Sequence, residues 1–290
     1  LIMPKYTSFK PSETQNLKSN SSIFSTNTAI VMGILNVTED SFFDGGKYSN
    51  PQQIVSRCKQ MLEQGAKIID IGAQSSRPGA ILIQAEEEVL KLLPIIKLLK
   101  TEIPEIIISI DTFWAKTAKE CILAGAHIIN DISAGEMDTT MYDTIAKLQV
   151  PYIIMHMQGT PQNMQSNPTY NNVVAEVITY FDKKIKQLKA KGIQQIIIDP
   201  GFGFGKTLSH NYQLLNALEQ FNQFEIPILI GTSRKSMIYK LLDINPQQAL
   251  NGTSITNTMA LQKGASILRV HDVKEAMECI KITTFAKNLS

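Results

Sequence analysis

The segment Ile106-Ile107-Ile108-Ser109-Ile110-Asp111 (residues 106–111) is a short apolar run that ends in a carboxylate. Seven similar runs occur along the chain, each rich in β-branched residues or Leu. The eight runs are Ile30–Leu35, Ile68–Ile71, Ile106–Ile110, Ile128–Ile129, Tyr152–Met155, Ile196–Ile198, Ile228–Ile230 and Ile267–Leu268. Continuous apolar runs of this length are typical of strands that are buried on both faces of a parallel sheet.

Nearly every run ends at a polar or charged cluster, although a core strand has no packing reason to end in a carboxylate, an amide or a guanidinium. The groups that follow the eight strands include Asn36, Arg77, Asp111, Asn130, His156, Asp199, Lys235 and Arg269. Eight parallel strands that bring such groups to one rim are typical of a (β/α)8 barrel, whose active face lies at the carboxyl ends of its strands.

Segments with helical periodicity separate the strands, so strand and helix alternate and parallel pairing follows. The expected helices are Pro51–Gln64, Ala85–Lys100, Ala115–Leu123, Thr139–Leu148, Val173–Lys191, Asn211–Phe221, Lys235–Leu242, Pro246–Gln262 and Val273–Leu289. Residues 1–28 are rich in Ser, Thr, Asn and Lys and predict a flexible, disordered tail. The fold class is therefore α/β: a single (β/α)8 TIM barrel domain over residues 29–290, preceded by that tail.

Composition narrows the class of protein. Lys and Arg total 28 against 26 Asp and Glu, and this balance gives no support to a nucleic-acid partner. Nor is a membrane partner expected, since no apolar stretch approaches the roughly 18–20 residues that span a bilayer. Cys58, Cys121 and Cys279 are widely spaced and form neither a disulfide nor a zinc pattern. Without an apolar leader segment, the chain is expected in the cytoplasm, with its thiols reduced.

Three kinds of polar group suggest a binding site. Asn36 offers an oxygen suited to Mg²⁺, which takes few protein ligands, although Asn also forms turns. Arg77 offers a planar fork for phosphate oxygens, or is a solvated loop residue. Asp111, Asn130 and Asp199 close three strands and could read the donor edge of a flat heterocycle; the alternative is that the aspartates cap helices.

The glycine-rich stretch 199–207 resembles a nucleotide phosphate loop, but Pro200 stands where the Walker pattern needs Gly. That interpretation is rejected; the glycines instead let backbone approach a flat ligand, with Phe204 as a wall. Arg269 and His271 share a face of the last strand, so both can address one anion. His156 and His271 lack the spacing of a metal site.

These segments together resemble the dihydropteroate synthase family from about Ile30 to the end. Eight motifs carry the resemblance, each after its own strand: residues 33–38 with 40–42 (GILNVT, DSF), 76–79 (SRPG), 109–112 (SIDT), 129–131 (IND), 155–159 (MHMQG), 199–206 (DPGFGFGK), 233–236 (SRKS) and 269–272 (RVHD). Any one motif is weak, but eight in order are specific.

The resemblance implies a transferase of folate biosynthesis that joins 6-hydroxymethyl-7,8-dihydropterin diphosphate to p-aminobenzoate. It implies that the pterin diphosphate is bound by Ser76, Asp111, Asn130, Met155, Asp199, Lys235, Arg269, Val270 and His271. It places Phe42, Pro78, Phe204, Lys235 and Ser236 near the aminobenzoate. It also implies Mg²⁺ on Asn36, catalytic roles for Arg77, Lys235, Arg269 and His271, and a homodimer.

Two positions depart from the family pattern. Glu39 stands where the first loop usually has Pro, and Ser76 stands where Thr is commoner. Both bear on loop motion and on the response to sulfonamide inhibitors. Two other functions stay open: a corrinoid-linked pterin methyltransferase, which would have no use for the anion clamp of Arg77, Arg269 and His271, and a non-catalytic pterin or folate carrier.

Overall fold

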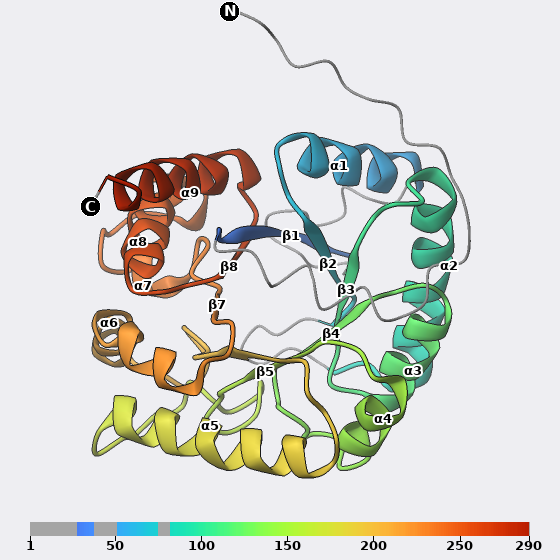
Figure 1. The fold of residues 1–290 in the computed structure, drawn as a ribbon, viewed down its shortest axis with the longest axis horizontal. Helices are drawn as coiled ribbons and strands as arrows, with labels where there is room; N and C mark the ends of the chain where they lie inside the picture. The colour runs from blue at the N-terminus through green and yellow to red at the C-terminus, as the bar shows by residue number, and fades with distance from the viewer. Residues whose placement is uncertain (1–27, 38–50, 75–81, 290) are drawn as a thin grey trace, which may run out of the picture.

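Eight parallel strands form the centre of the structure, and the helices surround them (Figure 1). The structure is a computed structural model that describes residues 28–37, 51–74 and 82–289. The strands are β1 (Ile30–Asn36), β2 (Ile68–Gly72), β3 (Ile108–Asp111), β4 (Ile128–Asp131), β5 (Tyr152–Met155), β6 (Ile196–Asp199), β7 (Leu229–Ile230) and β8 (Ile267–Val270).

The strands pair in the order β6-β5-β4-β3-β2-β1-β8-β7. A parallel bridge between Ile198 of β6 and Ile228, just before β7, joins the two ends of this sheet. The predicted (β/α)8 barrel is thereby confirmed. The predicted boundary at residues 28 and 29 lies at the edge of the described residues, so the division into tail and barrel stays a prediction, and residues 1–27 lie outside them.

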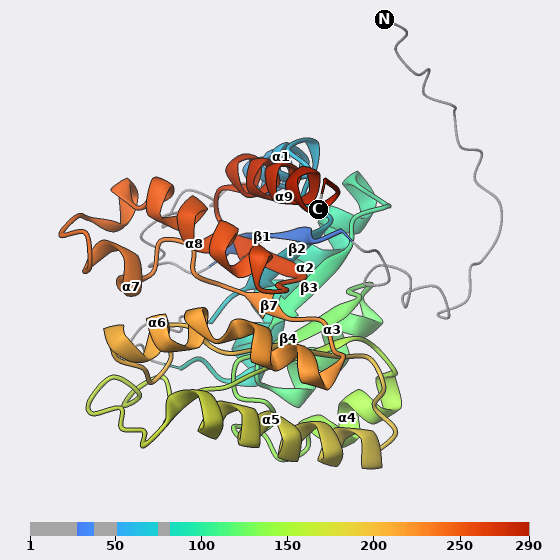
Figure 2. The ribbon, with the colours of Figure 1, turned by 60° about the vertical axis from the view of Figure 1, so that its left-hand side comes forward.

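Helices follow the strands as the sequence predicts. They are α1 (Pro51–Glu63), α2 (Ala85–Glu102), α3 (Ala115–Leu123), α4 (Met141–Leu148), α5 (Val173–Ala190), α6 (Leu208–Asn216), α7 (Ser236–Tyr239), α8 (Leu250–Gln262) and α9 (Val273–Lys287), with 3₁₀ turns η2 (Leu218–Phe224) and η3 (Pro246–Gln248). The last helix packs on the first strand, as Figure 2 also shows, so the two ends of the barrel sequence meet.

Three of the expected helices differ from the structure by three residues or more at one end. The helix expected over 211–221 begins at Leu208, because Thr207 and His210 form a capping box with each other, and it is followed by η2. Sequence reasoning missed this start since the box normally uses Glu or Gln at its third position. The helix expected over 246–262 is divided into η3 and α8, and that over 235–242 shortens to α7.

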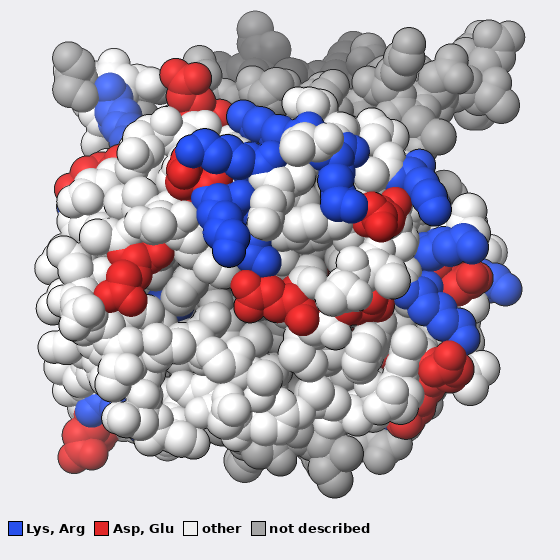
Figure 3. All heavy atoms as spheres, turned by 90° about the horizontal axis from the view of Figure 1, so that it is seen from below, with Lys and Arg blue, Asp and Glu red and all other residues white. Residues whose placement is uncertain are grey.

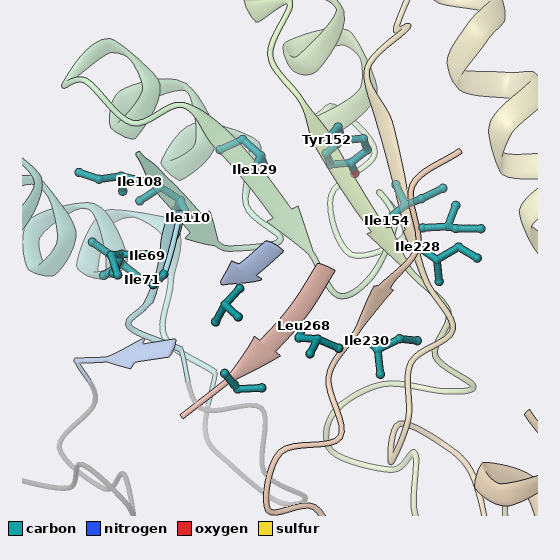
Figure 4. Packing of buried hydrophobic residues seen from close by; sticks show 14 of the residues in the cluster. Ile69, Ile71, Ile108, Ile110, Ile129, Tyr152, Ile154, Ile228, Ile230 and Leu268 are labelled. Carbon is teal, nitrogen blue, oxygen red and sulfur yellow. The ribbon is translucent and has the colours of Figure 1, made fainter. Parts of the chain in front are cut away.

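Side chains alternate between the two faces of each strand. Outward residues such as Ile69, Ile110 and Ile154 pack against the helices and form the large core (Figure 4). Inward residues fill the barrel with a second, smaller apolar layer, which consists of Met32, Ile68, Ile128, Ile153, Ile197, Leu229 and Ile267. The inward residue two positions later on most of these strands is polar. The barrel therefore has an apolar floor beneath a polar layer.

The surface carries charges of both signs. Figure 3 shows the face that lies at the bottom of Figure 1, where α5 runs. Basic and acidic groups lie next to one another on this face. Lys186 and Asp182 on α5 form one such ion pair. Among the described residues, no helix is both long and apolar enough to cross a bilayer.

Candidate active site

The layer at the carboxyl ends of the strands gathers side chains from six strands. Strand register places Asp111 of β3 beside Asn130 of β4, and Met155 of β5 beside Asp199 of β6. Each of these is the inward residue above the apolar floor. Arg269 of β8 and Asp70 of β2 join them from the other side of the barrel. The fold thus brings Asp111, Asn130 and Asp199 to the inner face of the barrel at the carboxyl ends of its strands.

Arg269 links two carboxylates across the barrel mouth. Its Nε donates to Oδ2 of Asp70 at 2.6 Å, and its Nη2 donates to Oδ2 of Asp111 at 2.7 Å. Burial raises the pKa of Asp111 to about 7, although the charge of Arg269 opposes that shift. Burial alone would lower the pKa of Arg269, but the two carboxylates raise it, so the guanidinium stays charged. The site therefore contains a permanent positive charge, on Arg269, next to the carboxylate acceptors Asp70 and Asp111.

Asp199 and Lys235 bring two further opposite charges to the site, and each charge acts on the pKa of the other group. Oδ1 of Asp199 accepts the backbone N–H of Gly201 at 2.8 Å. Nζ of Lys235 donates to the carbonyl of Phe202 at 2.6 Å and lies 4.3 Å from the centre of the Phe204 ring. Burial raises the pKa of Asp199 against the charge of Lys235, and burial lowers the pKa of Lys235 to about 8.

Lys206 ties the β6–α6 loop together from within. It is 3 % exposed, and its Nζ lies 2.9 Å from Nδ1 of His156. The same ammonium donates to the carbonyls of Gly201 at 2.9 Å, Phe204 at 3.0 Å and His156 at 3.2 Å. Burial lowers its pKa to about 7. This lysine is committed to loop carbonyls and not to a phosphate, in keeping with the rejected Walker interpretation.

Gly201 makes this loop possible. Its φ is +74°, and a Cβ at this position would lie 2.0 Å from the carbonyl oxygen of His156. Only glycine tolerates both conditions. His156 is used by Lys206, and burial lowers its pKa to about 2, so the ring is neutral and structural.

His271 lies at the end of β8 and is held by its neighbours. Its Nδ1 lies 3.0 Å from Oγ of Ser233, and its carbonyl accepts a hydrogen bond from Arg57 of α1 at 2.9 Å. Burial and the nearby charge of Arg269 lower its pKa to about 3, so the imidazole is neutral. Behind it, Arg234 donates two bonds to Asp272, each 2.8 Å long. Arg234 therefore joins the segment after β7 to the segment after β8.

An apolar wall borders the charged groups. Phe113, Met155 and Met157 are buried in one cluster, and Phe204 packs against it. Such a wall beside acceptors suits a flat ring with a polar edge. Ser236, the first residue of α7, is half-buried. The side chain of Val270 lies in the outward core, so only its backbone can face the site.

Asn36 ends β1 on the inward face, half-buried, and its side chain makes no hydrogen bond to another described residue. Within the described ranges no three His, Cys, Asp or Glu side chains gather as a metal site. A lone amide oxygen fits Mg²⁺, which completes its shell with water and substrate phosphates. Phe42, Ser76, Arg77 and Pro78, and also Glu39, lie outside the described residues.

Sequence reasoning missed Asp70, because it considered only the last residues of each strand. The signal was present: in Ile68-Ile69-Asp70 the period of two puts Asp70 on the same face as Ile68, inside the barrel. The same alternation puts the adjacent residues Asn130 and Asp131 on opposite faces of β4. Asn130 faces inward, and the carboxylate of Asp131 accepts hydrogen bonds from Tyr152 and Ser133 on the outer face. The helix-cap alternative was wrong for Asp111 and Asp199, since Trp114 and Thr207 occupy the N-cap positions.

Comparison with known proteins agrees with this geometry. The family model described as pterin binding enzyme matches residues 32–271. The chain belongs to the pterin-binding enzyme family. It is similar to the dihydropteroate synthase of Escherichia coli K12, with 43% identity over 254 residues, which cover 87% of this chain and 89% of the relative. The dihydropteroate synthase of Bacillus subtilis is 39% identical and covers 87% of each chain.

Solved structures of this family are similar as well. Dihydropteroate synthase of Yersinia pestis, in complex with a sulfonamide drug, has a TM-score of 0.87 and 40% identity, covering 95% of this chain and 97% of its own. The Xanthomonas albilineans synthase with 4-aminobenzoic acid has a TM-score of 0.83 and 36% identity, covering 90% and 94%. These members of the pterin-binding enzyme family thus share the barrel fold and more than a third of the aligned residues with this chain.

Proposed function

We propose that this protein is a dihydropteroate synthase, a transferase of folate biosynthesis. It condenses 6-hydroxymethyl-7,8-dihydropterin diphosphate with p-aminobenzoate to give 7,8-dihydropteroate and diphosphate. The observation that carries the proposal is the division of the barrel mouth into acidic and amide acceptors, Asp111, Asn130 and Asp199, beside the cation Arg269. The similarity to synthases over most of the chain supports the same reaction.

The acceptors bind the pterin. Asp199 has one oxygen committed to Gly201, which leaves the other for the adjacent ring N–H and amino groups of a pterin. Hydrogen bonds to a charged acceptor are about twice as strong as neutral ones. Asn130 and Asp111 supply further acceptors, Met155 lies under the ring, and Lys235 balances the charge of Asp199.

The cations stabilise the leaving group. The C–O bond between the pterin methylene and diphosphate breaks as the aniline nitrogen of p-aminobenzoate bonds to the methylene, and the nitrogen then loses a proton to solvent. Arg269 and Arg77 offset the developing negative charge, and neutral His271 donates a hydrogen bond. Asp199 favours the positive charge that spreads over the reduced pterin. Ser76 offers a hydroxyl to the same diphosphate.

Asn36 would hold Mg²⁺ at the rim, and the ion would supply further positive charge to the diphosphate. Phe204, Ser236 and Lys235 border the place for p-aminobenzoate, and Phe42 and Pro78 are proposed to bind it as well. We also propose that the protein acts as a homodimer in the cytoplasm, where its buried free thiols Cys58, Cys121 and Cys279 stay reduced.

The proposal is tested by incubating the protein with pterin diphosphate, p-aminobenzoate and Mg²⁺, and by measuring dihydropteroate and diphosphate. We expect both products in equal amounts, and we expect chelation of Mg²⁺ to lower the rate. Tight pterin binding without product at saturating substrates would instead identify a carrier. No dihydropteroate in this incubation, together with methyl transfer from a methylated reduced pterin to a corrinoid in a separate one, would identify a methyltransferase.

A further inference from the structure

Asp70 lies at the centre of the site, and its side chain is wholly buried. Its Oδ2 accepts two hydrogen bonds, from Nε of Arg269 at 2.6 Å and from Nδ2 of Asn130 at 3.1 Å. These donors come from β8 and β4, each two places away from β2 in the sheet. One carboxylate oxygen therefore joins the diphosphate side of the proposed site to its pterin side.

The contact with Asp70 decides which end of the Asn130 amide faces the ligand. The Asp70 oxygen already accepts from Arg269, so the group of Asn130 that faces it is the NH₂, and the amide cannot turn over without opposing two oxygens. Oδ1 of Asn130 is left as the free end, and no hydrogen bond to it occurs within the described part of the chain. Asn130 therefore presents an acceptor, as a pterin amino group requires.

Asp70 also fixes the Nε end of the Arg269 guanidinium. Arg269 is held by two carboxylates, but they differ in exposure: Asp111 is 22% exposed, whereas Asp70 is 0% exposed. A ligand that engages Asp111 leaves the Nε contact in place. Nη1 makes no bond to other described residues, so the outer edge of the guanidinium is free for an anion.

We propose that Asp70 is a positioning residue that orients both halves of the first substrate, the pterin through Asn130 and the diphosphate through Arg269. The proposal rests on the proposed function. It names a residue that touches neither substrate, because the side chain of Asp70 is 0% exposed. Within the described residues Oδ2 is hydrogen-bonded to these two donors, and the equally buried Oδ1 has no hydrogen-bond partner.

The first test is Asp70→Asn, which keeps size and removes the charge. We expect the KM for pterin diphosphate and the Kd for free 6-hydroxymethylpterin each to rise about tenfold or more, the usual cost of losing hydrogen bonds to a charged group. The KM for p-aminobenzoate should change less than about twofold. An unchanged KM for pterin diphosphate in a folded, active variant would overturn the inference. Failure of the proposed function shows differently: the parent itself makes no dihydropteroate.

A double-mutant cycle separates positioning from a general structural effect. If Asp70 acts on free pterin through Asn130, Asp70→Asn should cost no affinity in an Asn130→Ala background. Losses that simply add would contradict this route. The matched control is Asp131→Asn, a wholly buried carboxylate on the outward face of β4. It should lower the melting temperature while the KM for pterin diphosphate stays the same.

A second variant, in which both charged partners are replaced, covers the case in which Asp70→Asn does not fold. Asp70→Asn combined with Arg269→Met removes both partners, which buried ion pairs tolerate better than the loss of one. We expect this pair to bind free pterin about tenfold more weakly than the parent, since Asn130 has lost its orientation and Arg269 is proposed to contact the diphosphate, which free pterin lacks. Equal affinities would overturn the role of Asp70 in orienting Asn130.

Discussion

At the scale of the residue, the site is built from charges that are costly to bury and that offset one another. Burial raises the pKa values of Asp111 and Asp199, and cations beside them act in the opposite direction. Each carboxylate keeps an oxygen that is not fully used by the protein. Ligand donors would complete these acceptors, so the polar layer suits a ring with several N–H groups.

Asp199→Asn tests this at one acceptor. Asn can still accept the N–H of Gly201, so the loop should keep its shape, but the remaining group loses its charge. We expect the Kd for free pterin to rise roughly tenfold to a hundredfold. Calorimetry measures the affinity, and Asp182→Asn on the exposed face of α5 is the control. Equal affinity in parent and Asp199→Asn would remove Asp199 from the pterin site.

At the scale of the element, the site depends on how strands and loops are fixed from behind. The sequence predicts the strands well because a doubly buried strand is a continuous apolar run, and it predicts Asp111, Asn130 and Asp199 because they end such runs. It misses Asp70, which lies inside a run. It also misses that the ammonium of Lys206 is buried and donates to carbonyls of its own loop. Those contacts join segments far apart in sequence, and only the barrel register brings them together.

Lys206→Met tests the role of the β6–α6 loop. Four acceptors of Nζ would lose their partner, and we expect the free energy of unfolding to fall by about 3 kcal/mol. Because Phe204 is one of them, the KM for p-aminobenzoate should rise more than that for pterin diphosphate. The control is Lys184→Met, another buried lysine, which donates to Ala134. It should lower stability alone; the same KM pattern in both variants would contradict the prediction.

Glu88 of α2 supplies a pH-dependent test behind β3. It is wholly buried, Oγ1 of Thr112 donates to it at 2.5 Å, and burial raises its pKa from 4.5 to about 7. The folded protein therefore binds more protons than the unfolded chain over this range, so Glu88 lowers stability as the pH rises from 4.5 to about 7. Below 4.5 the carboxyl is neutral in both states and has no such effect.

Glu88→Gln should remove this loss, since Gln can accept the same bond from Thr112. Relative to the parent, the free energy of unfolding should rise by about 3 kcal/mol between pH 4.5 and about 7. Urea unfolding at several pH values measures the difference. Glu87→Gln, at an exposed neighbour that pairs with Lys91, is the control and should show no such trend. A constant difference across the range would show that Glu88 does not titrate there.

At the scale of the whole molecule, most of the exposed large apolar side chains of the described residues lie on one group of helices and the segments that follow them. Ile255 of α8 is 53% exposed and Ile282 of α9 is 69% exposed, and Leu241, which follows α7, is 54% exposed. The helices α7, α8 and α9 lie together on one side of the barrel (Figure 1). Exposed apolar groups that gather in this way favour an interface, which supports the proposed homodimer.

Sedimentation tests the dimer directly. We expect the parent to sediment at twice the 32.2 kDa of one chain. Ile255→Asp combined with Ile282→Asp should shift the equilibrium to the monomer, because two charges per chain would be buried without partners. Leu90→Asp on α2, 74% exposed and on the opposite side of the barrel from α8, is the matched control and should stay dimeric. A parent that is monomeric at micromolar concentration would refute the homodimer. A dimer that survives the paired substitution would place the interface on other helices. The proposed active site is formed by residues of one chain, so we expect its function to be kept in either case.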